Sequence, residues 1–424
     1  MKLKWFVCGL SCLMLVAAQL EAADWPQWQG PDRNSISKET GLLKNWPKDG
    51  PPLAWRVGKL GGGFSTPSVA EGRIYGMSYR DGNELVWALN ENGGKQEWAT
   101  KTGPAEEIGA AGFGGEGPRC TPTVDGELLY ALGPTGRFVC LNTADGQIVW
   151  RKNMKDDFGG HSMAQWHYCE SPLVDGDKVI CTPGGKEATV VALNKKTGDV
   201  IWKAHVPDGN GAGYASPIVI DAAGHRQYVH FLEAGPAGFD AETGKLLWRS
   251  SKSATRIANV ATPIFHDGCI FTAAAYGGGG ALVKLIAEGD GVKAEVVYTT
   301  KKMENHHGGI ILDKGYLYGA NGGNGGGYLV CLNFKTGKVQ WDERAGQRRA
   351  SKGSVALADN RIYYRQEDGT VILIEPSPKE YIEHGRFDQP DRSRSHAWAH
   401  PVIANGKLYL IDQDNLFCYD VAAK

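Results

Sequence analysis

Eight copies of one sequence unit run along nearly the whole chain, and this repetition limits the possible fold more than any other feature. The unit consists of Ser/Thr-Pro, a turn containing Gly, an Ile/Leu-Tyr pair, a Leu-Asn/Asp pair and, in five units, Gly-x-x-x-Trp. A repeat of 45 to 55 residues that holds several short strands predicts a β-propeller, in which each unit forms one radial sheet. The anchor position at the start of each unit falls at Pro67, Pro122, Pro172, Pro217, Pro263, Ile310, Val355 and Pro401.

Residues 121–150 illustrate how one unit becomes a blade. Turns of the Asp-Gly type separate four short runs rich in β-branched, aromatic and leucine residues, and such turns join antiparallel strands. The four expected strands begin near Thr121, Leu128, Phe138 and Gln147. The terminal Trp of the unit is predicted to be a wedge that packs between adjacent blades.

The two ends of the repeat region predict how the ring closes. The last unit, from Pro401 to Val421, has only three expected strands and lacks the terminal Trp signal. Near the other end, Leu53–Val57 matches the missing fourth strand. We therefore expect an all-β, eight-bladed propeller of four-stranded antiparallel blades that occupies residues 53–424 as a single domain, with the N-terminal strand closing the last blade.

Residues 1–22 have the pattern of a secretory signal, with Lys2 and Lys4 before the apolar stretch Trp5–Ala18 and small residues after it. The alternative is an uncleaved membrane anchor, which the short apolar stretch disfavours. No other segment is apolar enough to span a bilayer, so we expect an exported protein, periplasmic or extracellular. Residues 23–52 then form a leader segment whose place relative to the ring the sequence leaves open.

Charge and cysteine content narrow the possible partners and cross-links. A formal net charge of −1 argues against a nucleic-acid partner. Outside the signal there are seven cysteines, and Cys140, Cys331 and Cys418 occupy a repeat position that other units fill with Ala or Gly. We expect those three to be small buried residues. A disulfide among the remaining four stays open.

The Ala-Leu-Asn and Thr-Gly-x-x-x-Trp endings of the repeats resemble the PQQ-type (pyrroloquinoline-quinone) propeller family over residues 53–421. Within that family, the chain is most similar to secreted propellers of the type of the outer-membrane assembly factor BamB, and the leader motif Trp25–Arg33 resembles the opening of many such members. The resemblance extends distantly to the propeller of quinoprotein dehydrogenases. It implies a scaffold in the cell envelope with a protein partner, and it does not establish that a quinone binds.

Two positions of the repeat suggest where a binding site lies. The residue immediately before each anchor is mostly a small hydroxyl residue, which predicts a repeated structural hydrogen bond. Two residues earlier, the residue type differs in every unit, and this variation at the mouth of the ring is what a specific site requires. The opposing interpretation is a rim of solvated loop residues. The predicted ligand-binding residues are Arg119, His167, Glu170, Tyr214, Asn259, His307, Lys352, Trp398 and His400.

The three longest blade-joining loops contain a Gly-rich stretch, Gly109–Gly117, a second segment, His161–Tyr168, and a third, Arg386–Ser395. Because these loops join neighbouring blades on one side of the ring, they predict a lip or a partner-binding edge. The adjacent pair His306 and His307 is expected to point to opposite faces of a strand, which disfavours a shared metal ion. No metal site and no catalytic residue is predicted.

Three functions fit this pattern. The leading one is a non-enzymatic, monomeric scaffold that binds an envelope protein, a small molecule or a glycan. The second, implied by the family resemblance, is an oxidoreductase with PQQ and Ca²⁺, in which Arg119 and Lys352 hold the carboxylates, Trp398 stacks, and Glu170 and Asn259 bind the cation. Against it, the chain lacks the vicinal Cys-Cys pair of those dehydrogenases. The third is a propeller that binds or cleaves glycans, with Glu170 as the main acid.

Overall fold

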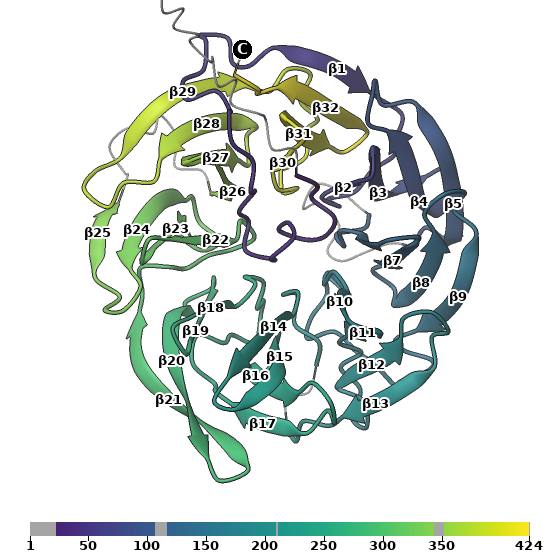
Figure 1. Ribbon diagram of the computed structural model, residues 1–424, viewed down its shortest axis with the longest axis vertical. Helices are drawn as coiled ribbons and strands as arrows, with labels where there is room; N and C mark the ends of the chain where they lie inside the picture. Colours follow the sequence, from purple (N-terminus) through teal and green to yellow (C-terminus); the bar gives the residue numbers. More distant parts are fainter. Residues whose placement is uncertain (1–22, 107–116, 209–210, 343–351, 424) are drawn as a thin grey trace, which may run out of the picture.

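A computed structural model describes residues 23–106, 117–208, 211–342 and 352–423, and shows a ring of eight radial sheets (Figure 1). Within these residues every regular element is a strand and each sheet has four antiparallel strands, so the predicted all-β, eight-bladed propeller is confirmed. No helix in this part of the chain is long and apolar enough to cross a membrane. The predicted signal, residues 1–22, lies outside the described residues, as does most of the Gly-rich loop Gly109–Gly117.

Each blade is a meander in which consecutive strands pair from the axis outward. The middle two strands are buried because neighbouring blades cover both of their faces. Blades 1 to 4 are β2 (Ser68–Ala70), β3 (Arg73–Arg80), β4 (Asn83–Asn90) and β5 (Gln96–Pro104); β6 (Thr123–Asp125), β7 (Leu128–Leu132), β8 (Arg137–Asn142) and β9 (Ile148–Asn153); β10 (Leu173–Asp175), β11 (Lys178–Cys181), β12 (Val190–Asn194) and β13 (Val200–Ala204); and β14 (Ile218–Ala222), β15 (His225–Leu232), β16 (Gly235–Asp240) and β17 (Leu246–Arg249).

The second half of the ring repeats this plan. Blades 5 to 8 are β18 (Ile264–His266), β19 (Cys269–Ala274), β20 (Gly279–Glu288) and β21 (Gly291–Thr300); β22 (Ile310–Asp313), β23 (Tyr316–Asn321), β24 (Tyr328–Asn333) and β25 (Val339–Asp342); β26 (Gly353–Ala358), β27 (Arg361–Gln366), β28 (Thr370–Glu375) and β29 (Ile382–Asp388); and β30 (Val402–Ala404), β31 (Lys407–Asp412), β32 (Asn415–Asp420) and β1 (Leu53–Val57).

The ring closes through β1, which forms the outermost strand of blade 8. Arg56 pairs with Phe417 and Val57 with Leu416 in an antiparallel ladder. This pairing confirms the closure expected from the missing fourth strand of the last unit. Because both chain ends are joined in one sheet, the edge of β32 is covered and the ring cannot open without breaking that ladder.

The Gly and the Trp of the repeat's end signal contact each other across blades. Trp98 in blade 1 donates its indole Nε1–H to the carbonyl of Thr143 in blade 2, at 3.0 Å. A Cβ at Gly146 would lie 2.5 Å from the Trp98 ring, so only glycine leaves room for the wedge. The wedge prediction is confirmed, and the same pairing recurs for Trp150 with Gly198, Trp202 with Gly244, Tyr298 with Gly337 and Trp55 with Gly94.

The leader crosses the middle of the ring, as the purple segment in Figure 1 shows. It forms bridges with inner strands on both sides, from Trp25 to Val69 in blade 1 and from Ile36 to Leu357 in blade 7. Leu42 then pairs with Ala422, beside blade 8. The leader therefore occupies part of the axial channel at this level.

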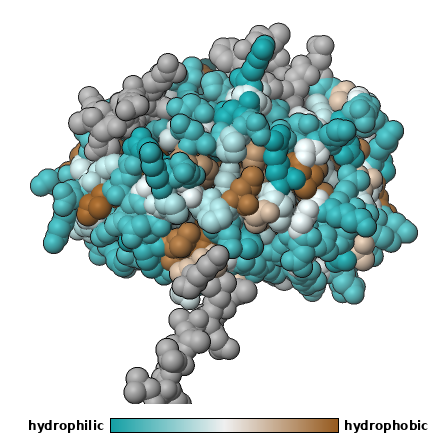
Figure 2. Space-filling model, turned by 90° about the horizontal axis from the view of Figure 1, so that it is seen from above, coloured by the Kyte–Doolittle hydropathy of each residue, from teal (hydrophilic) through white to brown (hydrophobic). Residues whose placement is uncertain are grey.

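The cysteines of the described residues form no disulfide bonds. The seven cysteines of the described residues are free, and Cys140, Cys331 and Cys418 are buried as expected. Cys140 lies directly opposite the wedge residue Trp150, where a larger side chain would collide with the indole. The edge of the ring in Figure 2 is mostly hydrophilic, with small, separate apolar patches.

Candidate functional site

A cavity of about 620 Å³ lies on the propeller axis, beside the segments that lead into the inner strands. One residue from each blade lines it, always from the position three residues before the anchor. This position faces the axis because it lies just before the inner strand, where all eight blades converge. We call this set the cavity ring: Phe64, Arg119, Cys169, Tyr214, Val260, His307, Lys352 and Trp398.

A second ring lies two residues further along the chain and holds neighbouring blades together. The hydroxyl of Ser171 accepts a hydrogen bond from the backbone N–H of Thr121, and the hydroxyl of Ser216 accepts one from Ser171, both at 2.9 Å. The repeated hydrogen bond predicted from the hydroxyl position is present in these links and in the one from His400 to Thr66. We call this set the frame ring: Thr66, Thr121, Ser171, Ser216, Thr262, Gly309, Ser354 and His400.

Aromatic rings cover one wall of the cavity. The indole of Trp398 stacks on His396 at 5.4 Å with an interplanar angle of 14° and lies 4.8 Å from the ring of Phe64. Its Nε1–H donates to Glu367 Oε1 at 2.6 Å, which fixes the orientation of the indole plane. The guanidinium of Arg119 lies 5.4 Å from the centroid of Phe64. Trp398 therefore presents a fixed flat surface, with a cation beside it.

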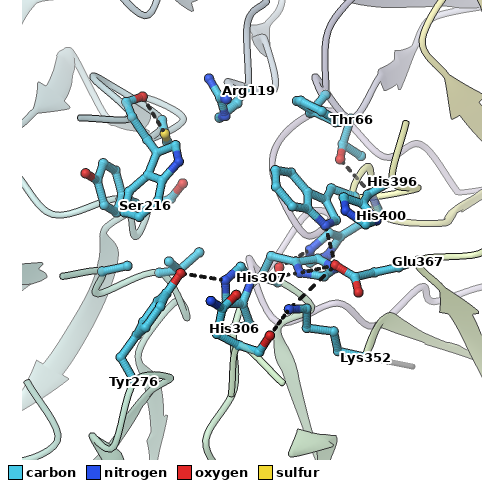
Figure 3. A pocket seen from close by; sticks show the side chains of 18 of the residues that line it. Thr66, Arg119, Ser216, Tyr276, His306, His307, Lys352, Glu367, His396 and His400 are labelled. Carbon is cyan, nitrogen blue, oxygen red and sulfur yellow. Dashed lines mark hydrogen bonds and ion pairs between the residues drawn. The ribbon is translucent and has the colours of Figure 1, made fainter. Parts of the chain in front are cut away.

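The second cation, Lys352, lies beside the one carboxylate that lines the cavity among the described residues. Its Nζ and the Nδ1 of His307 are each 3.9 Å from Glu367 Oε1. Burial lowers the pKa of Lys352, and the Glu367 carboxylate opposes that shift. Figure 3 shows Arg119 well apart from the Lys352 and Glu367 pair, so positive charge reaches the cavity at two separate places.

Histidines line the floor and side of the cavity near blades 6 to 8. His306 Nε2 lies 3.1 Å from the hydroxyl of Tyr276, and the Nδ1 atoms of His306 and His307 are 3.2 Å apart (Figure 3). Burial lowers the pKa of His306 to about 3 and that of His400 to about 4, and it lowers the pKa of His307 well below its usual value. At neutral pH these imidazoles are uncharged, so they supply ring surface and hydrogen bonds.

The histidine pair differs from its predicted arrangement. His306 and His307 precede β22 and lie in a loop, so both rings face the cavity, whereas a strand would send them to opposite sides. Even so, the described residues contain no group of three or more His, Cys, Asp or Glu side chains that could hold a metal ion.

The opposite wall comes from blades 3 and 4. Trp166 meets Tyr214 edge to face, with ring centroids 5.8 Å apart and planes at 78°. Gln165 and Trp166 belong to the loop His161–Tyr168, which the sequence singled out as a lip. The floor is Trp28 of the leader, whose ring lies 4.5 Å from that of His400. The cavity is thus enclosed by aromatic surface on both walls and below.

Six of the nine predicted residues line the cavity, and three do not. Glu170 is buried in blade 3, where its carboxylate accepts a hydrogen bond from the hydroxyl of Thr182 at 2.6 Å, and burial raises its pKa to about 7. Asn259 donates to the carbonyl of Leu232 at 2.8 Å and shapes a loop. His167 has a positive φ of 58° and does not line the cavity.

Several lining residues were missed from the sequence. Glu367, Tyr276 and Asn324 come from the turns between the second and third strands of blades 7, 5 and 6. In a four-stranded meander those turns reach the same face as the blade-joining segments, so their position in the repeat was an available signal. Trp28 had no such signal, because nothing in the leader's sequence fixes where it meets the ring.

The cavity residues fit only half of a PQQ and Ca²⁺ site. Arg119, Lys352 and Trp398 line the cavity and suit a flat ring system with carboxylates. The two expected calcium ligands, Glu170 and Asn259, lie elsewhere and already have hydrogen-bond partners. Calcium prefers six to eight oxygen ligands, and one carboxylate lines this cavity within the described ranges. The donor set does not fit the cation.

Comparisons with known proteins place this geometry among propellers of one family. Residues 83–343 match the family described as outer membrane protein assembly factor BamB. The BamB of Yersinia pestis is 22% identical over 225 residues, which cover 53% of this chain and 52% of that protein. The chain therefore matches only about half the length of that curated relative.

Solved structures share the fold. BamB from Moraxella catarrhalis superposes with a TM-score of 0.60 at 14% identity, covering 88% of this chain and 98% of that one. Quinohemoprotein alcohol dehydrogenase from Comamonas testosteroni gives a TM-score of 0.67 at 14% identity, covering 95% of this chain and 81% of that one. At such identities the likeness concerns the fold alone.

Proposed function

Because the chain belongs to the family described as outer membrane protein assembly factor BamB, we propose that it is an exported, non-enzymatic propeller that acts as a binding scaffold in the cell envelope. Its axial cavity binds a small ligand that combines a flat, apolar ring system with an anionic group. The name of the family supports an envelope role and a protein partner, and the cavity supports the ligand class.

The observation that carries the ligand class is the composition of the cavity lining. Flat side chains line both walls and the floor, and stacked rings are the surface that a flat ligand covers most completely. The neutral histidines add ring surface without charge. A saturated, flexible ligand would leave much of this surface uncovered.

Charge selects among flat ligands. Arg119 and Lys352 bring two cations to the cavity, and Glu367 brings one carboxylate that already accepts the indole N–H of Trp398. The balance favours an anion, which would gain a charge-assisted hydrogen bond in partly buried surroundings. Binding needs no more than this, and the residues lining the cavity offer no activated nucleophile beside a base.

The test uses a matched pair of probes. 1-Anilinonaphthalene-8-sulfonate is flat, aromatic and anionic, whereas N-phenyl-1-naphthylamine has the same ring system without the sulfonate. We expect saturable fluorescence enhancement with the sulfonate, and at least about tenfold weaker binding in the double variant Arg119→Met/Lys352→Met, because a hydrogen bond to a charged group is worth about 1.5–3 kcal/mol. The uncharged probe should bind that variant within about twofold of wild type.

The control variant is Lys335→Met, which removes an exposed lysine on the outer part of blade 6. Its binding of both probes should equal that of wild type. The proposal fails if the wild-type protein shows no saturable binding, or if the double variant binds the sulfonate as tightly as wild type. A cavity that merely collects apolar molecules would bind both probes as tightly in the double variant as in wild type.

PQQ and neutral envelope glycans are further arms of the same experiment, read as thermal stabilisation. PQQ is flat and carries carboxylates, so it should stabilise the protein to the same extent with and without Ca²⁺. Stabilisation that requires Ca²⁺ would contradict the donor argument and favour an oxidoreductase. Stabilisation by neutral glycans alone would contradict the charge argument and favour a carbohydrate-binding propeller.

A further inference from the structure

The leader motif Trp25–Arg33, which we call the plug segment, lies between two cavities on the axis. Trp28 lines the ligand cavity, whereas Gln29 and Arg33 line a second cavity of about 320 Å³. Blades 4, 5 and 6 line most of the rest of the second cavity, at or just after their anchors, through the inner strands β14, β18 and β22. Along the axis the order is therefore ligand cavity, plug segment, second cavity.

Three blades hold one side of the plug segment. The N–H and C=O of Trp25 both bond to Val69 in blade 1, at 2.8 Å, and the carbonyl of Pro26 accepts from Val124 in blade 2. The guanidinium of Arg33, only 4% exposed, donates to the carbonyls of Ser171 and Pro172 in blade 3. These contacts are buried and directional, so the segment has one fixed position.

The other side of the plug segment rests on frame-ring residues. The indole N–H of Trp28 donates to the Thr262 hydroxyl at 2.8 Å, and its ring meets that of His400. At Gly309, which has a φ of 68°, a Cβ would lie 2.6 Å from the side-chain nitrogen of Gln29. Gly309 and His400 are the two frame-ring positions without a hydroxyl, and both face the plug segment.

The two frame-ring positions that depart from the repeat, Gly309 and His400, both contact the plug segment, which lies outside the repeat. This coincidence suggests that they serve one role together. We infer that the plug segment is a built-in part of the binding site, with Trp28 as a ligand-contacting residue that sets the depth of the cavity. The inference rests on the proposed function, since it needs a ligand in the cavity. Removing the Trp28 ring would deepen the ligand cavity and take away the floor on which a flat ligand rests.

The first test replaces Trp28 in the full-length protein. Trp28→Ala should weaken the binding of 1-anilinonaphthalene-8-sulfonate and of N-phenyl-1-naphthylamine alike, each by at least about fivefold, because a stacking contact does not depend on the sulfonate. Trp28→Phe keeps a flat ring and should stay within about threefold of wild type. Equal loss of both probes separates this role from that of Arg119 and Lys352, whose removal affects the charged probe.

Lys38→Ala is the matched control, since Lys38 belongs to the same leader but is exposed, with 63% of its side chain accessible. It should bind both probes as wild type does. If Trp28→Ala also binds both probes as wild type does, the inference is wrong while the proposed function stands. If the wild-type protein binds neither probe, the proposed function fails and the ligand-contacting role of Trp28 fails with it.

A second test judges the position of the plug segment without any ligand. Gly309→Ala adds a Cβ against Gln29, whereas Gly315→Ala in the same blade has a similarly positive φ of 84° and nothing within 4 Å. Both substitutions carry the backbone strain, but only the first adds an atom against the leader, where the end of the Gln29 side chain must move. Tryptic cleavage at the Arg33–Asn34 bond, followed by mass spectrometry, should be faster in Gly309→Ala than in Gly315→Ala. Equal cleavage rates would show that the segment is not seated on Gly309.

Discussion

The frame ring and the cavity ring lie two residues apart in every blade, yet they differ in how much the residue type varies from blade to blade. In the frame ring, six of eight residues are Ser or Thr, and three of the links join one blade to the next through a hydroxyl. In the cavity ring every blade has a different side chain. Both rings belong to the short segment before the inner strand, so the difference in residue variation comes from what the side chains face. The frame ring faces the neighbouring blade, and the cavity ring faces the axis.

The comparison teaches how a symmetric fold acquires an asymmetric site. A hydrogen bond between blades needs the same small group in each unit, so variation there costs stability. A side chain that faces the axial cavity is not required to link the blades in every unit, so it can vary with little cost to the fold. The two frame-ring exceptions, Gly309 and His400, both contact the leader, although His400 also keeps its link to Thr66 in the neighbouring blade.

The largest expected effect is a loss of folding stability at low pH. It comes from buried histidines whose hydrogen-bond partners carry no charge. The pKa of His230 is lowered to about 3, that of His306 to about 3 and that of His400 to about 4, in each case mainly by burial. Above pH 6.5 neither state binds the protons. Below it, the unfolded chain takes up protons that the folded protein cannot, so stability falls as the pH falls, by about 3 kcal/mol for three histidines between pH 6.5 and 5.5.

Glu170 acts in the opposite direction. Its pKa is raised to about 7, so over this pH range the folded protein binds a proton that the unfolded chain does not, which adds about 1 kcal/mol of stability as the pH falls. For these four groups the net loss is about 2 kcal/mol, and the buried His307, whose pKa is also lowered, adds to it. Chemical unfolding at both pH values measures the loss. His306→Asn should reduce this loss by about 1 kcal/mol. A protein whose stability is unchanged between pH 6.5 and 5.5 would contradict the neutral, buried state of the three imidazoles.

The next effect tests the two rings directly within one blade. Ser171→Ala leaves the buried N–H of Thr121 without its acceptor and should lower the free energy of unfolding by about 1–3 kcal/mol. Cys169→Ala, two residues earlier in the cavity ring, removes no link between blades and should cost less than about 1 kcal/mol. Urea unfolding of both variants gives the comparison, and equal losses would mean that the two rings do not differ in structural role.

The sequence predicted most of the fold because the fold is built from local, repeated signals. The anchors counted the blades, and the unmatched strand Leu53–Val57 predicted the closure. The varied repeat position indicated where the cavity ring lies, and five of its eight residues were among the predicted ligand-binding residues, namely Arg119, Tyr214, His307, Lys352 and Trp398. Local repeat signals could not predict where the leader lies, because its contacts are long-range. Trp28, for example, bonds to Thr262, which is 234 positions away in the sequence.

Within the predicted site, backbone alternation explains which residues face away from the cavity. Cys169 and Ser171 face the axis and the neighbouring blade, so Glu170 between them points into its own blade, where Thr182 receives it. Asn259 precedes Val260 and faces away for the same reason. His167 escapes the alternation because its positive φ interrupts the extended chain. The sequence prediction therefore included too many residues, because it took polar residues near the anchor without asking which face of the chain each one occupies.

The smallest effect sharpens the comparison inside the frame ring itself. Ser354 occupies the same position as Ser171 and is fully buried, but its hydroxyl has no hydrogen-bond partner. The preceding blade has Gly309 at this position, held with a φ of 68° against Gln29 of the leader. Ser354→Ala should therefore change the free energy of unfolding by less than about 0.5 kcal/mol, since no bond is lost.

The contrast between Ser171→Ala and Ser354→Ala, measured under the same unfolding conditions, separates position from partner. If the frame ring stabilises the propeller only through the links seen between blades, the two variants differ by about 1 kcal/mol or more. If Ser354→Ala is as costly as Ser171→Ala, the small hydroxyl is needed for the shape of the inner strand whether or not a neighbour uses it. In that case the lack of a hydroxyl at Gly309 and His400 would itself affect the shape of the inner strand. Their contact with the leader would then no longer explain why these two positions differ from the repeat.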